Sequence, residues 1–325
     1  MRGARALACP ASLKGVLHAQ AAASALAEGF RRAGVEVDEV PVADGGEGTA
    51  AVLEATLGGE WQEARVADPL GRPVEARWLR LPDGTAVVES AAALGLPLLA
   101  PEERDPLAAS SRGLGQLVRA ALATRPSALL VALGGVATVD GGAGLLAELA
   151  TLGGVPTVAA CDVRAPLLGP RGAARAFGPQ KGATPEGVEE LERRLASRPD
   201  LAPWAELPGA GAAGGLGAAL ASLGAELVGG AELVLMRIDF GRRLRGAALA
   251  VTGEGTVDAT TAEGKAPAAV AAACRAEGVR CVVFGGRVER GLPGAETVPL
   301  SGRPESARAD LVLLGERLGS TIVSR

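Results

Sequence analysis

Apolar and polar positions follow the chain in blocks that predict an α/β fold. The chain begins with a short apolar run over residues 4–9, which predicts a strand, and continues with apolar residues at helical spacing over 18–32. Gly34 is placed to end that helix, and an alternating run over 35–41 predicts a second strand. The order strand, helix, strand is typical of a parallel α/β layer.

The pattern changes at residue 60. Residues 60–67 and 74–81 alternate apolar with charged side chains around a turn at 68–71, which predicts an antiparallel hairpin with one solvated face. Before it, Thr49 is placed to cap a short helix that ends at Gly58 and Gly59.

The rest of the chain returns to alternating strands and helices. We expect strands at 128–133, 155–161, 247–252 and 279–284, and helices at 185–196, at 266–277 and within 305–318. This order predicts one α/β domain built from both chain ends, residues 1–59 and 241–325. A second α/β domain, residues 60–240, is inserted between them.

Composition narrows the function classes. The chain has 325 residues, with 33 basic and 37 acidic side chains and a net charge of −4. It has no stretch in which basic and aromatic residues alternate, so we do not expect it to bind nucleic acid. No apolar run reaches the length of a membrane span, and we expect no membrane partner. Four scattered cysteines with a single histidine argue against zinc and structural disulfides, so we expect a cytoplasmic protein.

Glycine clusters follow several of the expected strands. At the carboxyl ends of parallel strands, bare backbone amides can approach an anionic ligand. The alternative is that glycine is common in this chain and simply ends strands in tight turns. Residues 209–214 match the spacing GxGxxG but do not follow a convincing strand, and Gly264-Lys265 lacks the spacing of a nucleotide-binding P-loop. The clusters of interest contain Gly134, Gly135, Gly211, Gly214, Gly253 and Gly255.

The lysines give a further signal. Only Lys14, Lys181 and Lys265 occur in a chain with 33 basic residues, and each has a glycine neighbour. An ammonium is a compact charge that suits a phosphate on a glycine-rich loop, so these lysines are candidates for phosphate contacts. The alternative is that they are three remaining surface lysines.

Five carboxylates are expected in loops directly after predicted strands. They are Asp44, Asp140, Asp162, Glu254 and Asp258. Phosphoryl transfer needs ligands for Mg²⁺ and a group that receives the proton of the substrate hydroxyl, and carboxylates can do both. Each carboxylate could instead form a turn or cap a helix. Since His18 is the only histidine, a histidine base is not expected.

Taken together, the motifs resemble the bacterial type-1 glycerate kinases. The resemblance covers nearly the whole chain in the family's order, and its longest segments are ADGGEGT at 43–49 and FGPQKGAT at 177–184. The other matching segments are SLKG at 12–15, DPLGRP at 68–73, residues 134–144, CD at 161–162 with GPRG at 169–172, residues 207–217, TGEG at 252–255 and GKAP at 264–267.

This resemblance implies transfer of the ATP γ-phosphate to a hydroxyl of D-glycerate, the 2-hydroxyl in better characterised members, with ATP and Mg²⁺ as cofactors. It also implies a discontinuous Rossmann-like domain and an inserted mixed α/β domain. Within it we infer the roles as follows. Lys181 and Lys265 hold phosphates, Lys14 faces the glycerate carboxylate or the transferred group, Asp44 or Asp162 is the base, and Glu254, Asp258 and Asp140 are candidate metal ligands. Gly134, Gly135, Gly211, Gly214, Gly253 and Gly255 bind the nucleotide.

The chain also departs from the family pattern. Apolar residues stand at Ala11, Val136, Val139 and Ala165, where the family tends to have aspartate, serine or asparagine, and threonines stand at 256 and 260 in place of arginine and glutamine. The segment between Leu149 and Val158 is shorter than usual by several tens of residues, which shortens the inserted domain. Two rivals follow: a family member that binds ligand without turnover, and a kinase of another small hydroxy acid. A nicotinamide oxidoreductase is more distant, and a homodimer is left open.

Overall fold

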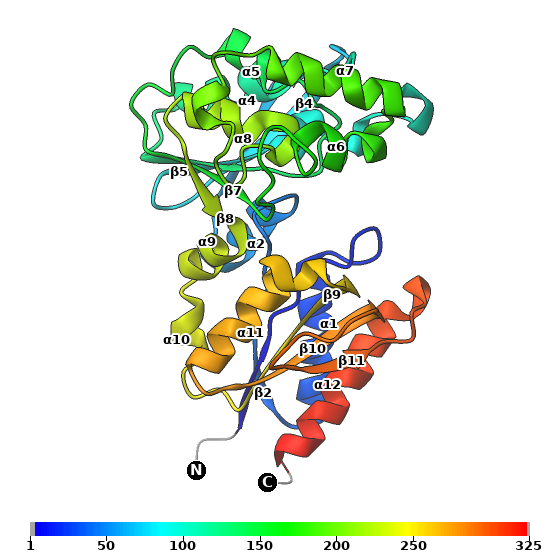
Figure 1. Cartoon of the computed structure of the whole chain (residues 1–325). Helices are drawn as coiled ribbons and strands as arrows, with labels where there is room; N and C mark the ends of the chain where they lie inside the picture. Colours follow the sequence, from blue (N-terminus) through cyan, green and yellow to red (C-terminus); the bar gives the residue numbers. More distant parts are fainter. Residues whose placement is uncertain (1–3, 324–325) are drawn as a thin grey trace. The chain divides into compact units, whose positions relative to one another are not determined.

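The structure is a computed structural model that describes residues 4–323, apart from the side chain of Glu263. The chain divides into two compact units (Figure 1). The terminal unit contains Met1–Asp44, Ala51–Thr56 and Ala231–Arg325, and the middle unit contains Gly45–Ala50 and Leu57–Gly230. The domain limits placed at 59 and 240 from the sequence stay a prediction.

The terminal unit is built on a parallel sheet with the strand order β11-β10-β9-β1-β2. Strands from the two ends of the sequence meet in it, because β1 lies between β2 and β9. The strands are β1 (Arg5–Ala8), β2 (Glu36–Glu39), β9 (Leu249–Val257), β10 (Arg280–Val288) and β11 (Glu296–Pro299).

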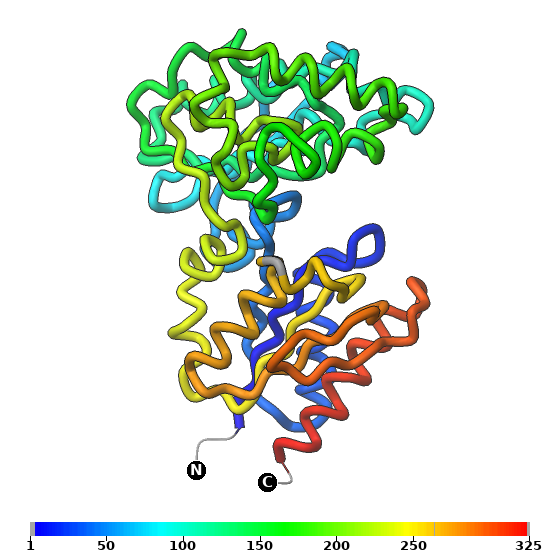
Figure 2. Tube along the Cα trace, in the orientation of Figure 1, coloured from blue at the N-terminus to red at the C-terminus, as the bar shows by residue number. Residues whose placement is uncertain are grey.

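Helices cover both faces of this sheet. Helix α1 (Ala19–Arg32) and helix α12 (Ala307–Val323) lie side by side, the blue and red segments of Figure 2, although almost the whole chain separates them in sequence. Both helices pack on one face of the sheet, against buried strand side chains such as Ala8, Val251 and Phe284. Helix α11 (Ala266–Ala276) lies on the other face (Figure 1). Gly34 follows α1 with φ +76°, as expected for a glycine that ends a helix.

Two strands run further than the sequence predicts. The sequence predicts strands that end at residues 252 and 284, but β9 continues through Gly253 and Gly255 and β10 continues through Gly285 and Gly286. The ladder continues through Glu254 opposite Gly285. Glycine is required here because a Cβ on Gly253 would lie 2.2 Å from the carbonyl oxygen of Phe284. The prediction that Glu254 lies in a loop is therefore wrong.

The middle unit has a six-stranded mixed sheet with the order β3-β4-β5-β6-β7-β8. The predicted hairpin is confirmed, since β3 and β4 pair antiparallel from Glu60 opposite Arg80 to Ala67 opposite Pro73. The pairs from β5 to β8 are parallel. The strands are β3 (Glu60–Ala67), β4 (Pro73–Arg80), β5 (Thr85–Glu89), β6 (Ala128–Ala132), β7 (Thr157–Cys161) and β8 (Glu226–Gly229).

One face of this sheet carries the main core of the middle unit. Residues of α3, α4, α5 and α8 pack there against buried strand residues such as Val88, Val131 and Ala159. A second apolar cluster joins α6, α7 and α8. The helices are α3 (Ser90–Leu94), α4 (Arg112–Ala123), α5 (Ala143–Glu148), α6 (Ala173–Phe177), α7 (Pro185–Ala196) and α8 (Ala212–Ser222).

Three further α-helices lie within the described residues. They are α2 (Thr49–Leu57), α9 (Gly230–Arg237) and α10 (Phe240–Leu244). The two sheets, one parallel with strands from both chain ends and one mixed, confirm the predicted α/β class. Among the described helices, none is both long and apolar enough to cross a membrane.

Candidate active site

In the terminal unit, the ends of β1 and β9 bring several predicted residues together. Glu254 lies within β9, and its Oε1 accepts a hydrogen bond from the Thr261 hydroxyl at 2.8 Å. Its Oε2 lies 3.8 Å from Nζ of Lys265, the residue that precedes helix α11. Burial raises the pKa of the Glu254 carboxyl, while the Thr261 hydroxyl and the Lys265 ammonium oppose that rise. The pair therefore places a positive and a negative group where a parallel sheet commonly binds ligands.

Two more acidic groups and the Lys14 loop lie around this pair. The charges of Asp44 and Asp258 both raise the pKa of Glu254, so these carboxylates lie close to it. Asp258 Oδ1 accepts hydrogen bonds from the backbone and hydroxyl of Thr260, at 2.8 and 2.6 Å. Asp258 thus forms a local turn, which is the alternative to metal binding considered above for each carboxylate. The backbone of Lys14 lies beside Gly255, where a Cβ would be 3.7 Å from the backbone nitrogen of Lys14, and the Lys14 residue is exposed.

In the middle unit, the loop Gly45–Ala50 lies over the carboxyl ends of the parallel strands. A Cβ on Gly45 would lie 2.4 Å from Cα of Gly230, which follows β8, and 3.1 Å from the side chain of Ala160 in β7. A Cβ on Gly134, after β6, would lie 3.2 Å from Cα of Gly46. Only glycines allow these approaches of one backbone to another.

Glu89 holds this loop, and the sequence reasoning missed it. Its Oε1 accepts a hydrogen bond from the amide of Ala50 at 2.7 Å, and the amide of Gly48 also donates to the carboxylate. Burial raises the pKa of Glu89 in spite of these bonds. The prediction that Thr49 caps the helix is wrong: Thr49 is its first residue, and its buried hydroxyl has no hydrogen-bond partner among the described residues. Glu89 could have been found, because it is another carboxylate directly after an apolar run.

In the middle unit, a second group of predicted residues contains Lys181, Asp140 and Gly214. The Lys181 side chain is 4% exposed, and its ammonium donates a hydrogen bond of 2.8 Å to the carbonyl oxygen of Thr138. No other partner of this ammonium is present among residues 4–323. Burial lowers the pKa of Lys181 to about 7, although the negative charge of Asp140 acts in the opposite direction. When protonated, Lys181 is therefore a buried cation with two N–H groups that have no partner among the described residues.

Asp140 anchors the loop that follows β6. Its Oδ2 accepts hydrogen bonds from the amide and hydroxyl of Ser111 at 2.8 and 2.7 Å and from the amide of Gly144 at 3.1 Å. Its Oδ1 accepts from the amide of Gly142 at 3.0 Å. These four bonds use most of the lone pairs of a carboxylate. Metal ligation by Asp140 stays a prediction, and the described residues contain no cluster of three potential metal ligands.

The glycines of the 209–217 segment form a left-handed turn against the same loop. Ala213, Gly214 and Gly215 have φ angles of +51°, +75° and +95°. A Cβ on Gly214 would lie 2.0 Å from the carbonyl oxygen of Thr138, the atom that accepts from Lys181. Gly211 instead packs on the carbonyl oxygen of Pro166, 2.2 Å from a hypothetical Cβ. Left-handed alanine is strained, and such strain persists where the surrounding structure fixes it.

The remaining predicted residues lie at the ends of other strands. Asp162 follows β7, where burial, together with the charge of Asp162, raises the pKa of the Cys161 thiol. Gly135 lies beside the carboxylate of Glu47, 3.2 Å from a hypothetical Cβ. The departures Val136 and Val139 are buried in the two apolar clusters of the middle unit, so neither position presents a side chain to solvent.

A cavity of about 590 Å³ lies elsewhere, between β3 and α4 of the middle unit. None of the predicted site residues lines it. The chemistry of the strand ends, and not the size of this cavity, therefore identifies the candidate site.

Comparison with known proteins agrees with this arrangement. A model of the glycerate kinase family matches residues 6–152 and 149–301. The chain belongs to the glycerate kinase family. It is therefore an ATP-dependent kinase with a small-molecule acceptor.

Relatives in the family cover most of the chain. A glycerate kinase of Bacillus subtilis (strain 168) is 38% identical over 322 residues, which cover 86% of this chain and 84% of the relative. A glycerate 2-kinase of Escherichia coli (strain K12) is 39% identical over 303 residues, 81% and 80% of the two chains. The crystal structure of a Salmonella typhimurium LT2 protein assigned as glycerate kinase 2 has a TM-score of 0.85, with 31% identity and 99% of both chains covered.

Proposed function

We propose that this chain transfers the γ-phosphoryl group of ATP to the 2-hydroxyl of D-glycerate. The family supports the nucleotide and the acceptor, and the similarity to a glycerate 2-kinase favours the 2-hydroxyl. In this proposal, the enzyme works by positioning the reactants and by neutralising charge, as phosphoryl transfer requires.

The observation that carries the proposal is the buried ammonium of Lys181. A lysine with one carbonyl partner and almost no solvent is costly unless an anion completes its surroundings. The transferred phosphoryl group is such an anion, and its charge spreads over three oxygens in the transition state. Lys181 would stabilise that charge most strongly because little water competes with it.

Lys265 and Lys14 would serve the anionic groups at the strand ends of the terminal unit. Lys265 lies 3.8 Å from Glu254 and precedes a helix, whose N-terminal amides also favour an anion. Lys14 is exposed beside Gly255 and would meet the glycerate carboxylate or the transferred group.

The acidic residues beside Lys265 fit a magnesium ion. Mg²⁺ in kinases is bound by one or two carboxylates together with phosphate oxygens and water, and Glu254 supplies a carboxylate beside Lys265, with Asp258 close to it. When bound, the ion would neutralise charge on the phosphates. Glu254 would hold it, and Asp258 would fix the turn behind it through its bonds to Thr260.

The proton of the substrate hydroxyl needs an acceptor, and the two candidates are Asp44 and Asp162. Asp162 follows β7 beside Cys161, and Asp44 lies in the motif at 43–49, close to Glu254. Asp44→Asn and Asp162→Asn separate them: loss of the base lowers kcat about 10²-fold to 10⁴-fold, while the other variant retains most of its activity.

An ADP-release assay with D-glycerate, ATP and Mg²⁺ tests the proposed function, and phosphorus NMR of the product identifies the hydroxyl. We expect turnover and 2-phosphoglycerate. A panel of small hydroxy acids tests the acceptor, and a better substrate in that panel would replace glycerate. Calorimetric binding of ATP and glycerate without turnover would instead support the rival of a ligand-binding protein, for which the apolar Val136 and Val139 are the motivation.

A further inference from the structure

Strand β3 forms one edge of the six-stranded sheet. It pairs with β4 along its whole length from Glu60 to Ala67, and no described strand pairs with its other side. Free edges of this length are templates for pairing with another chain, and proteins usually shorten or cover them.

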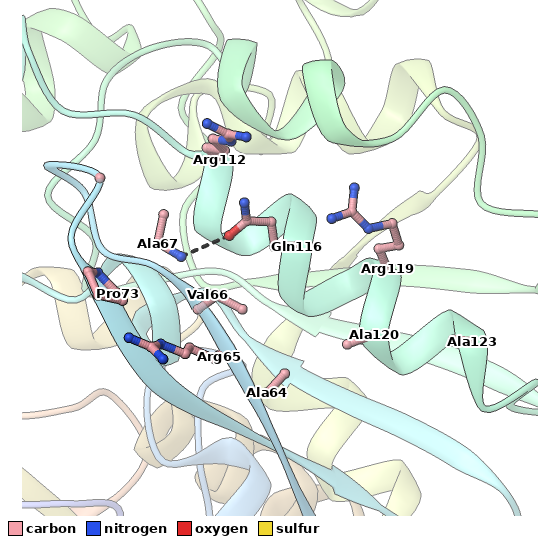
Figure 3. Close-up of a pocket in the computed structure, with 11 residues that line it drawn as sticks. Ala64, Arg65, Val66, Ala67, Pro73, Arg112, Gln116, Arg119, Ala120 and Ala123 are labelled. Carbon is pink, nitrogen blue, oxygen red and sulfur yellow. Dashed lines mark hydrogen bonds between the residues drawn. The ribbon is translucent and has the colours of Figure 1, made fainter.

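The free side of β3 presents backbone groups that can pair. Ala67 lies opposite Pro73, which has no N–H, and the Ala67 amide donates outward to Oε1 of Gln116 at 2.8 Å (Figure 3). Because peptide directions alternate along a strand, the peptide groups of Glu63 and Arg65 also point away from β4. Within residues 4–323, these two peptide groups form no hydrogen bond to another element.

Space for a further strand exists beside this edge. The cavity of about 590 Å³ runs along β3, and its other wall is helix α4, with Gln116, Arg119 and Ala120 (Figure 3). The strand contributes Ala64, whose small side chain leaves the edge accessible from the side of the helix.

Charges on the opposite face of the hairpin form a pattern that can match itself. Glu63 lies opposite Arg77, and Arg65 lies opposite Glu75, with all four side chains exposed. Each of these two cross-strand pairs forms a row of side chains that ends at the free edge. One row ends in the negative Glu63 and the other in the positive Arg65. None of the described ion pairs involves Glu63 or Arg65.

We propose that β3 is a dimerisation strand that pairs antiparallel with β3 of a second copy of this chain, on a two-fold axis through Ala64. In this register, Glu63 of each copy lies opposite Arg65 of the other. A row across both hairpins then alternates in charge, from Arg77 and Glu63 of one copy to Arg65 and Glu75 of the other. Opposite charges directly across a strand pair stabilise it, and like charges destabilise it.

The charges also select this register. An axis through Glu63 would place two glutamates opposite each other, and an axis through Arg65 would place two arginines opposite each other. The axis through Ala64 avoids both and lies near the middle of the strand, so most of β3 can still pair.

Charge reversal tests the proposal by sedimentation velocity from about 1 to about 100 μM protein. We expect a wild-type dimer that dissociates in Glu63→Arg and in Arg65→Glu, because each variant places like charges across the interface. The double variant E63R/R65E should dimerise again. Within one copy, the double variant worsens both pairs with β4, so recovery cannot come from a gain in the stability of the hairpin.

A cysteine at the axis tests the register. Cα atoms of a non-hydrogen-bonded antiparallel pair lie about 4.5 Å apart, which allows a disulfide. Ala64→Cys should therefore cross-link two copies under mild oxidation, while Glu186→Cys, exposed on α7, should not. A wild-type monomer at every concentration, or a dimer that both single reversals leave intact, would overturn the proposal. A monomer that binds an acidic peptide along Arg65 would assign the edge to that ligand instead.

Discussion

Lys181 is a buried lysine, and its burial disfavours the charged form of the side chain. Lys181→Met keeps the length and apolar part of the side chain and removes the charge. We expect kcat to fall about 10²-fold to 10³-fold, since a cation that faces the developing phosphoryl charge is lost. The coupled assay measures this, with Lys181→Arg as the charge-retaining comparison. A rate within a few-fold of wild type would remove Lys181 from the site.

The lowered pKa of Lys181 also predicts a dependence of stability on pH. The folded-state pKa of Lys181 is about 7 and the ordinary pKa of a lysine is 10.5, so between these values the unfolded chain binds one more proton than the folded chain. The free energy of unfolding of the wild type, relative to Lys181→Met, should therefore rise with pH across this window. The rise is at most about 1.4 kcal/mol per pH unit. Below about pH 7 both states hold the proton and the difference is constant.

Urea unfolding of both proteins at pH 7 and pH 9 measures this difference. The Met variant is the reference because it removes only the titrating group. An equal difference in stability at both pH values would mean that water or another group keeps Lys181 charged in the folded protein.

At the scale of elements, the contact between Glu89 and the loop Gly45–Ala50 is the most informative. Glu89→Ala removes the acceptor for the amides of Gly48 and Ala50 and should lower the free energy of unfolding by about 1–2 kcal/mol. Glu89→Gln retains one acceptor oxygen and should lose less. Hydrogen exchange at residues 48–50 should accelerate in the Ala variant, and unchanged exchange there would mean that the loop is held by other contacts.

The periodic elements could be predicted from the sequence, and those that depend on tertiary packing could not. The alternation in β3 and β4 and the helical spacing of α1 gave bounds within a residue or two. Strands β9 and β10 were expected to end at their glycines, because nothing local shows that Phe284 occupies the space beside Gly253. Helix α4 was not predicted at all, although it covers β3.

The candidate site follows the same division. Lys181, Glu254 and Lys265 stood out because of their type and their glycine neighbours. Glu89, Thr138 and Thr261 did not, because their roles depend on hydrogen bonds between segments far apart in sequence or across a turn.

At the scale of the whole molecule, the four cysteines report on folding. All are free and buried, and burial raises the pKa of Cys9 and raises that of Cys161 to about 11. A thiol reagent such as DTNB should therefore label neither Cys9 nor Cys161 in the folded protein, because the thiolate is the reactive form. All four should react on unfolding. Rapid labelling of one thiol in native buffer would reveal local opening around that cysteine.

The uneven exposure of the three lysines makes ordinary amine chemistry selective in this enzyme. Lys14 is exposed, the side chain of Lys265 is 26% exposed, and Lys181 is 4% exposed. Reductive methylation should therefore modify them in that order, and peptide mass spectrometry can assign every modified amine without mutagenesis. Protection of each lysine by nucleotide or by glycerate would then map the two ligands onto the two units of the native chain.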